Sequence, residues 1–350
     1  MTSLLLLKLL LEKCFFWDSD EKIVLSQRLF GVRCDKNKVS PKFIYFYMTS
    51  RAFQWELQSR ATGTTVKGLR QPELLKCEIH LPNIVVQRKI SYILSNIENK
   101  ININEKINKN LSNIIDVIFK NIVGNYENLK DVVLSDNTRE IIRGFNSKYV
   151  DKSNLINFNQ KVNKGIFIEK QYFKYLNESI KVPKEKFAKK RDVLINSLGQ
   201  GTLGRTHYYN EDTDNVVIDQ HITIIRANED LIPSTYIYEY LKNPTGQYHL
   251  DSLISGSTGM LMLNISDIRN LKIPILPKNK LKEFDLNVTP LFDKITMNFN
   301  EIEKLTKLRD TLLLKLMSGE IDVSKVNCDL KIIIRKFILN PLKYFMEVFK

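Results

Sequence analysis

The sequence predicts an α+β fold in which two related globular modules each lead into a long helix. Three observations predict this fold. The chain repeats itself at a separation of about 193 residues, each copy begins with strand-like segments, and each copy ends in a long amphipathic stretch. The 350 residues are 43% hydrophobic and 26% charged, which is typical of a globular chain with two domains.

The internal repeat is visible in the letters themselves. Residues 24–48 read VLSQRLFGVRCDKNKVSPKFIYFYM, and residues 217–241 read VIDQHITIIRANEDLIPSTYIYEYL. One duplication of this length indicates two copies of a domain-plus-helix module rather than a solenoid. Matched positions 193 apart are Gln27 and Gln220, Arg33 and Arg226, and Gly63 and Gly256.

Within each module the coarse secondary structure can be read in order. The run from Leu4 to Leu11 predicts a buried strand or a helix start, because it lacks the basic flank and cleavage site of a targeting signal. IVLSQRLFGV and VVIDQHITII predict strands, whereas KFIYFYM and TYIYEYL fit either a strand or a short helix. NISDIRNLKIPIL predicts a helical turn followed by a strand.

The two long stretches predict coiled-coil helices of about 30 residues each, or roughly 45 Å. Asn104 and Asn298 fall at equivalent stripe positions, and Pro290 should kink the second helix or delay its start. Two ordinary core helices are the alternative, but two matched helices after two matched modules favour an antiparallel pair. The predicted stripes are Ile90, Ile93, Ile97, Ile101, Ile107, Leu111, Ile114 and Ile118, then Val288, Leu291, Ile295, Ile302, Leu305, Leu308, Leu312 and Leu316.

The charge balance indicates a polyanionic partner. Lys and Arg number 53 against 39 Asp and Glu, which gives a net charge of +14. Nucleic acid or an anionic membrane surface is favoured over a small-molecule pocket. Four cysteines and four histidines show neither CxxC nor HxxxH spacing, so we expect no metal, no disulfide framework and no cofactor. The cytoplasm is the expected compartment.

A glycine-rich motif lies at residues 199–204. Gly199 to Gly204 fits GxGxxG, but the letters after Gly204 predict strand and turn rather than the helix that a dinucleotide site needs. A tight turn that brings backbone close to a phosphate or to another strand is favoured. The chain also lacks NPPY, Walker A and GxSxG motifs, so we expect no catalytic residues.

A basic run precedes this glycine turn. Lys181 to Arg191 holds six basic residues and one acidic residue, and polar side chains follow within the turn. A solvated charge run is the ordinary interpretation, but these residue types also suit phosphate and base-edge contacts. The candidate DNA contacts are Lys186, Lys189, Lys190, Arg191, Asn196, Gln200, Thr202, Arg205 and Gln220, then Ser257, Thr258, Thr64, Thr65 and Lys67 in loops of the same kind.

The repeated signature resembles the DNA specificity (S) subunits of type I restriction-modification systems. TGTTVKGLRQPELLKCEIHLP, SGSTGMLMLNISDIRNLKIPILP and the closing LRDTLLLKLMSGEI carry the resemblance, which covers roughly residues 13–325. It implies two target recognition domains that each read half of a bipartite site in double-stranded DNA. It also implies an antiparallel helix spacer that docks modification (methyltransferase) subunits, with the restriction subunit bound indirectly, no catalysis by this chain and no membrane partner.

Under this resemblance the expected domains are a truncated first recognition domain at 1–82 and a central spacer helix at 83–125. A second recognition domain at 126–278, a C-terminal spacer helix at 279–318 and a basic tail at 319–350 follow. The first domain lacks a counterpart of residues 192–204, so we expect that it cannot read its half-site alone. The alternative is a degenerate fragment that acts as a protein-interaction scaffold without reading DNA sequence.

Overall fold

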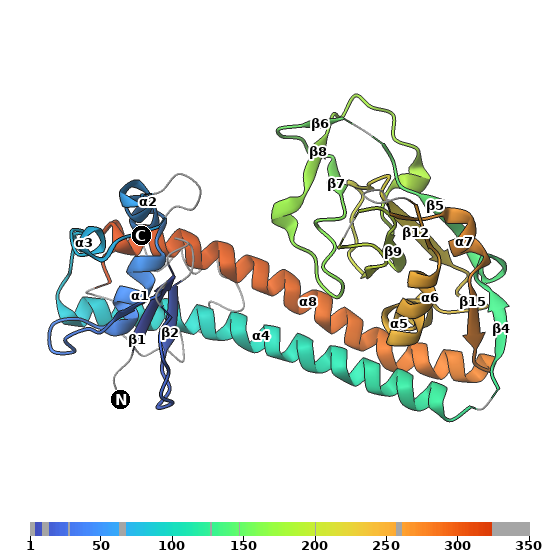
Figure 1. Cartoon of the computed structure of the whole chain (residues 1–350), viewed down its shortest axis with the longest axis horizontal. Helices are drawn as coiled ribbons and strands as arrows, with labels where there is room; N and C mark the ends of the chain where they lie inside the picture. Colours follow the sequence, from blue (N-terminus) through green and yellow to red (C-terminus); the bar gives the residue numbers. More distant parts are fainter. Residues whose placement is uncertain are drawn as a thin grey trace. The chain divides into compact units, whose positions relative to one another are not determined.

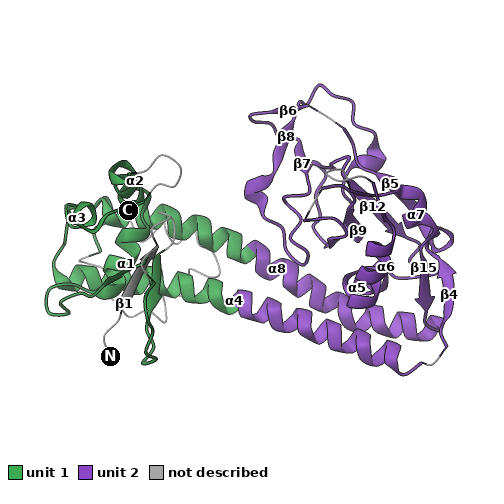
Figure 2. Ribbon diagram, viewed as in Figure 1, with its two compact units in different colours: residues 1–103, 301–350 green, residues 104–300 purple. Residues whose placement is uncertain are grey.

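The computed structural model divides the chain into two compact units, which Figure 2 colours separately. Unit 1 comprises residues 1–103 and 301–350, and unit 2 comprises residues 104–300. Two long helices, α4 (Ile84–Gly124) and α8 (Lys278–Met317), each contribute to both units. The structure describes the backbone of residues 4–8 and all atoms of residues 14–26, 29–62, 68–126, 128–146, 148–199, 201–256 and 261–323.

Unit 1 contains a small antiparallel sheet and three short helices (Figure 1). Strands β1 (Leu4–Lys8), β2 (Cys14–Trp17) and β3 (Leu29–Val32) pair in the order β2-β1-β3, so the leucine run begins as a strand. Helices α1 (Pro41–Thr49), α2 (Arg51–Arg60) and α3 (Gln71–Leu74) follow. KFIYFYM is therefore helical, the second of its two predicted states.

Unit 2 is larger and is organised around two four-stranded sheets. One sheet has the order β10-β9-β12-β5 and the other β11-β7-β8-β6, and β15-β4 and β13-β14 form two further pairs. The strands are β4 (Lys130–Val133), β5 (Thr138–Arg143), β6 (Tyr149–Val150), β7 (Ile156–Phe158), β8 (Lys174–Leu176), β9 (Asp192–Asn196), β10 (Thr206–Tyr209), β11 (Val216–Ile218), β12 (Ile222–Ala227), β13 (Ile254–Ser255), β14 (Met262–Leu263) and β15 (Lys272–Ile275). The short helices are α5 (Ser234–Lys242), α6 (Pro244–Ser252) and α7 (Ile265–Asn270).

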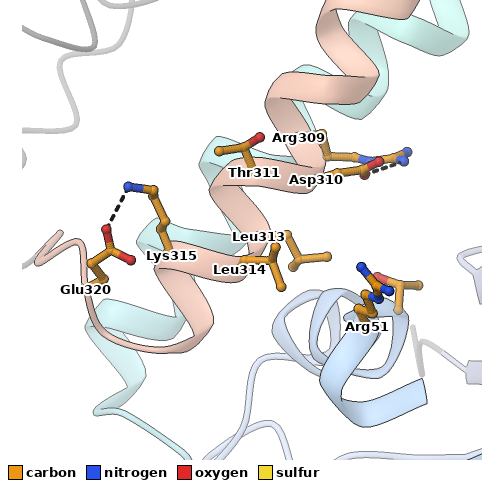
Figure 3. A pocket seen from close by; sticks show the side chains of 9 residues that line it. Arg51, Arg309, Asp310, Thr311, Leu313, Leu314, Lys315 and Glu320 are labelled. Carbon is orange, nitrogen blue, oxygen red and sulfur yellow. Dashed lines mark hydrogen bonds and ion pairs between the residues drawn. The ribbon is translucent and has the colours of Figure 1, made fainter. Parts of the chain in front are cut away.

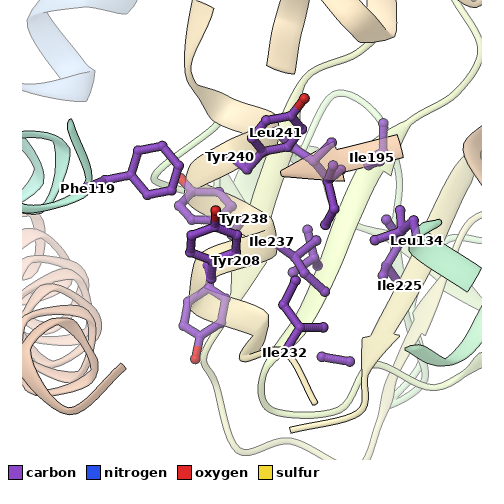
Figure 4. Close-up of a cluster of buried hydrophobic side chains, with 14 of the residues drawn as sticks. Phe119, Leu134, Ile195, Tyr208, Ile225, Ile232, Ile237, Tyr238, Tyr240 and Leu241 are labelled. Atoms are coloured by element: carbon purple, nitrogen blue, oxygen red, sulfur yellow. The ribbon is translucent and has the colours of Figure 1, made fainter. Parts of the chain in front are cut away.

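The β10-β9-β12-β5 sheet is covered on both faces, because alternate side chains of a strand point to opposite sides. Ile225 of β12 joins one buried cluster with the side chains of α5, α4 and α8, whereas Ile224 joins a second cluster with β7 and β11. Figure 4 shows part of the first cluster. The ring centroids of Phe119 in α4 and Tyr236 in α5 lie 5.4 Å apart, and those of Phe292 in α8 and Tyr208 in β10 lie 4.7 Å apart. Aromatic rings thus attach the sheet domain to the long helices of its own unit.

The two long helices pack together and run antiparallel. In unit 2, Phe119 of α4 meets Phe284 of α8 with ring centroids 5.8 Å apart, and in unit 1 Lys100 pairs with Glu301 at 3.3 Å. The residue later in α4 therefore contacts the residue earlier in α8, as expected for antiparallel helices. This arrangement confirms the predicted α+β fold class with two antiparallel helices.

The predicted apolar stripe of α4 is wrong at Ile114 but correct on both sides of it, because Leu111 and Ile118 pack against the core of unit 2. Ile90, Ile97 and Ile101 are buried, but Ile114 is 48% exposed, and Ile115 and Phe119 face the core instead. A straight helix repeats every 3.6 residues, so a stripe extended in steps of three and four drifts off the buried face when one step is misplaced.

The long helices contain buried asparagines and one internal proline. Asn104 and Asn298 are both buried, and Asn298 Nδ2 donates to Asn108 Oδ1 at 2.8 Å between the two helices. Helix α8 begins at Lys278 and continues through Pro290, so a start delayed by that proline is wrong.

The duplication extends to individual hydrogen bonds at a separation of 193 residues. The N-cap side chain of Ser50 accepts from the Phe53 N–H, as Asn243 accepts from the Gly246 N–H. Gln54 Nε2 donates to the Met48 carbonyl at 2.6 Å, and Gln247 Nε2 donates to the Leu241 carbonyl at 2.6 Å. Helices α1 and α2 are therefore structural counterparts of α5 and α6.

Candidate nucleic-acid interface

The glycine motif forms a tight turn between β9 and β10. Gly199, Gly201 and Gly204 have φ values of 99°, 81° and 77°, in the left-handed region that favours glycine. The Thr202 N–H donates to the Gly199 carbonyl at 3.3 Å, and the Gly204 N–H donates to the Asn196 carbonyl at 2.9 Å. Strand β10, not a helix, follows the motif, which excludes the dinucleotide-binding arrangement.

A second turn lies beside the glycine turn. It runs from Asp219 to Ile222, and the Ile222 N–H donates to the Asp219 carbonyl at 3.0 Å. The Ser197 N–H donates to the His221 carbonyl at 2.8 Å, which joins this turn directly to the end of β9.

The hairpin β13–β14 is joined to the end of β9, beside these two turns. The Leu263 N–H donates to the Ser197 carbonyl at 3.0 Å, and Leu198 bridges Met262. Arg143 donates to the Thr223 hydroxyl at 2.8 Å and also to the Leu263 carbonyl, so it fastens the hairpin to β12. We call the described residues of 196–205, 219–222 and 254–263 the turn edge. The structure thus gathers three regions that the sequence singled out separately.

Several predicted contact residues hold the domain together instead of facing outward. Asn196 is fully buried, accepts from Asn163 Nδ2 at 3.0 Å and donates to the Gln160 carbonyl at 3.2 Å. Arg205 donates to the Asn163 carbonyl at 3.0 Å, and Lys186 donates to the Arg143 carbonyl at 2.9 Å. These contacts position the turn edge.

Two predicted basic residues bind the long helix of their own unit. Lys190 pairs with Asp293 at 3.6 Å, and Arg191 pairs with Asp285 at 2.7 Å. Arg191 also has a φ of 74° and lies 3.2 Å from Glu229. Because a positive φ is costly for a side chain other than glycine, these ion pairs hold Arg191 in place.

The remaining predicted residues divide into two groups. Lys189 is exposed, and Thr202 and Gln220 are partly exposed on the turn edge. Outside the described residues lie Gln200, Ser257, Thr258, Thr64, Thr65 and Lys67, together with Gln27 and the tail after Val323.

The basic region of the sequence extends beyond the run from Lys181 to Arg191. Residues 159–191 contain ten Lys and Arg against three Glu, so this segment carries about half of the net charge of the chain. Its exposed lysines outside the predicted set are Lys161, Lys174, Lys181 and Lys184. Tyr172 is also exposed, and Lys164 Nζ lies 5.0 Å from its ring centroid. Charge counted over the whole segment would have found these residues.

Unit 1 has a groove of its own with a volume of 690 Å³ (Figure 3). Arg51 of α2 faces the last turns of α8 across it, and Leu314 is exposed there. The ion pairs Arg309–Asp310 and Lys315–Glu320, at 2.8 and 2.6 Å, line its helix side. A lining of this kind suits a protein segment with apolar and charged side chains.

His207 has a structural role in the core of unit 2. Burial lowers the pKa of His207 to about 4, and its ring stacks on Phe158. Within the described ranges, no three His, Cys, Asp or Glu side chains are grouped to hold a metal. No helix in the described part of the chain combines the length and apolar character needed to cross a membrane.

The fold and the sequence are similar to those of known proteins. A family model described as the type I restriction modification DNA specificity domain matches residues 15–113. The type I restriction enzyme MjaIX specificity subunit of Methanocaldococcus jannaschii is 26% identical over 322 residues, covering 83% of this chain and 71% of that relative. The HindI specificity subunit of Haemophilus influenzae is 36% identical over 86 residues, covering 25% of this chain and 19% of that relative.

A solved structure shows the same fold. The S subunit of a type I restriction-modification system from M. genitalium has a TM-score of 0.60 and 17% identity, covering 90% of this chain and 83% of that chain. The α+β domains and the two antiparallel helices thus define an S-subunit fold. In sequence over most of its length, and in fold, the chain is similar to the DNA specificity (S) subunits of type I restriction-modification systems. In such systems the S subunit is the non-catalytic specificity component.

Proposed function

We propose that unit 2 reads one half of a bipartite DNA site with its turn edge, while residues 159–191 contact the phosphate backbone. The convergence of three turns with the most basic segment of the chain is the observation that carries this proposal. Exposed lysines supply sequence-independent affinity, and polar side chains on a rigid edge supply base contacts. Such a complex would act on DNA in the cytoplasm.

We propose further that the outward faces of the long helices bind modification subunits, through which the restriction subunit joins indirectly. Val85, Tyr92 and Ile103 of α4 are exposed in unit 1 and recur at spacings of 7 and 11 residues. Such spacings return to the same side of a helix, away from the buried seam. Leu286 and Met297 of α8 are exposed in unit 2 at a spacing of 11 residues. The groove beside Leu314 belongs to this docking surface.

We expect the N-terminal module to contribute little base reading by itself. Its described part forms one three-stranded sheet, whereas unit 2 builds its turn edge on β9, β10 and β12. No described element of unit 1 takes the place of the β9–β10 glycine turn.

The experiment that tests DNA reading measures binding of the full chain, with its modification subunit, to random-sequence duplex across a salt titration. Replacing Lys161, Lys174, Lys181 and Lys184 with Ala should reduce the slope of log K against log salt by about one for each lost phosphate contact. Lys130→Ala with Lys272→Ala, on the separate β4–β15 pair, is the matched control and should leave the slope unchanged. A flat salt response of the unaltered chain with retained modification subunit would favour a protein-interaction scaffold.

A further inference from the structure

Asp219 organises a polar cluster at the centre of the turn edge. The Asp219 carboxylate is almost fully buried and accepts three hydrogen bonds. Its Oδ1 accepts from the backbone N–H of His221 at 3.0 Å and lies 2.8 Å from Nδ1 of the His221 ring. Its Oδ2 accepts from the hydroxyl of Tyr149 at 3.0 Å. One buried carboxylate therefore fixes the orientation of two exposed rings.

The backbone around this cluster is fixed as well. Gly144 and Phe145 run alongside the turn, where the Phe145 N–H donates to the Ile218 carbonyl at 2.7 Å and the Gln220 N–H donates to the Phe145 carbonyl at 3.2 Å. A Cβ atom on Gly144 would lie 2.2 Å from the Asp219 carbonyl oxygen, so only glycine fits there. The turn is held on both sides and presents Gln220 and His221 from a rigid support.

The hydrogen bonding also determines what the His221 ring offers. A carboxylate can only accept, so Nδ1 carries a hydrogen and Nε2 is the ring nitrogen that Asp219 leaves unbound. The Gln220 amide nitrogen lies 3.5 Å from Nε2. Two adjacent side chains thus present an imidazole nitrogen and an amide with both donor and acceptor groups.

We infer that Gln220 and His221 are specificity-determining residues that read a purine edge in the major groove, and that Asp219 and Tyr149 position them. This inference rests on the proposed DNA reading by unit 2. Base readout needs polar groups whose rotamers are fixed before binding. A glutamine amide matches the N6 and N7 positions of adenine, and an imidazole nitrogen adds one donor or acceptor to the neighbouring edge. The lysines of residues 159–191 supply cations for phosphate contact, so the neutral amide of Gln220 is better suited to a base edge.

The test selects bound duplexes from a randomised library with the full chain and its modification subunit. Gln220→Ala and His221→Ala are each expected to lose the preference at one base position and to lower the ratio of specific to non-specific affinity about 10- to 100-fold. Non-specific affinity should stay within about twofold. Asp219→Asn keeps the side-chain shape and should weaken the same base preference less than His221→Ala does. His80→Ala, an exposed histidine of unit 1, is the control.

The outcomes separate this inference from the proposed function. If the unaltered chain enriches no sequence from the library, the inference and the proposed function are both wrong. Selection by the unaltered chain with the same preference in Gln220→Ala and His221→Ala would overturn the inference alone. Loss of non-specific affinity together with an unchanged base preference would show phosphate contact and would also overturn it. Melting temperatures of all variants establish that each is folded, and His221→Gln replaces His221→Ala if the latter is not.

Discussion

At the scale of single residues, burial decides which polar side chains are structural and which are available to a ligand. Arg226 was one of the matched positions of the repeat, and it is buried in ion pairs with Asp192 and Glu140. Its counterpart Arg33 is exposed. Arginine at equivalent positions of the repeat is therefore buried in unit 2, where Asp192 and Glu140 pair with it, and exposed in unit 1.

Ionisation of the buried Glu239 side chain should make the free energy of unfolding depend on pH. Burial, and secondarily the Asp116 carboxylate, raise its pKa from 4.5 to about 7, although Lys242 lowers it. The folded state therefore holds this proton more tightly than the unfolded state does. The contribution of this group to the free energy of unfolding is highest below pH 4.5 and falls as the pH rises through about 7.

Glu239→Gln should therefore stabilise the protein by about 1–3 kcal/mol at pH 8 and by much less at pH 4.5. Lys242 keeps Asp116 as a partner at 2.7 Å, so the substitution leaves no buried ammonium unpaired. Calorimetric melting at the two pH values measures the difference. The exposed pair partner Glu283 provides the control, because Glu283→Gln should show no such dependence. Equal effects of Glu239→Gln at both pH values would contradict the assignment.

Gly144→Ala should destabilise unit 2 by about 2–4 kcal/mol, because the added methyl group meets the backbone carbonyls of Ile218 and Asp219. Gly124→Ala in α4 is the matched control, since a Cβ atom there has open space and alanine favours the helix. Urea denaturation monitored by circular dichroism gives both values. A neutral Gly144→Ala would mean that the turn edge is more adaptable than its contacts indicate.

At the scale of elements, periodicity and repeats predicted most of the fold, and long-range contacts were not predictable. The long helices, the glycine turn followed by a strand, and the matched modules all follow from local spacing. TYIYEYL could be a strand or a helix, because aromatic residues suit both, and burial of nearly all of α5 against the sheet and the long helices selects the helix. The Tyr149–Asp219 hydrogen bond joins residues 70 positions apart, so no local pattern announces it.

The buried asparagine pair of the long helices illustrates specificity at the same scale. Asn298→Ala should cost about 1–3 kcal/mol, because the buried Asn108 Oδ1 loses the donor that it accepts from. Replacing both residues with Leu should recover this loss, since an apolar pair leaves no unsatisfied group. A double-mutant cycle by thermal melting measures the coupling. Additive effects of the two single substitutions would contradict a direct interaction.

At the scale of the whole molecule, the chain divides its tasks between regions of different chemistry. The basic segment of residues 159–191 is suited to phosphates, the rigid turn edge to bases, and the apolar outward faces of α4 and α8 to protein partners. This division agrees with the proposal that the chain reads DNA and binds protein partners through separate surfaces.

The most direct test of this account is selection of preferred duplexes by the full chain with its modification subunit, followed by a salt titration on the selected sequence. We predict an enriched half-site preference that depends on unit 2, together with affinity that falls steeply with salt. Two spaced half-sites of equal strength would contradict the minor role expected for the N-terminal module. Binding without any sequence preference would contradict the central claim that unit 2 reads DNA.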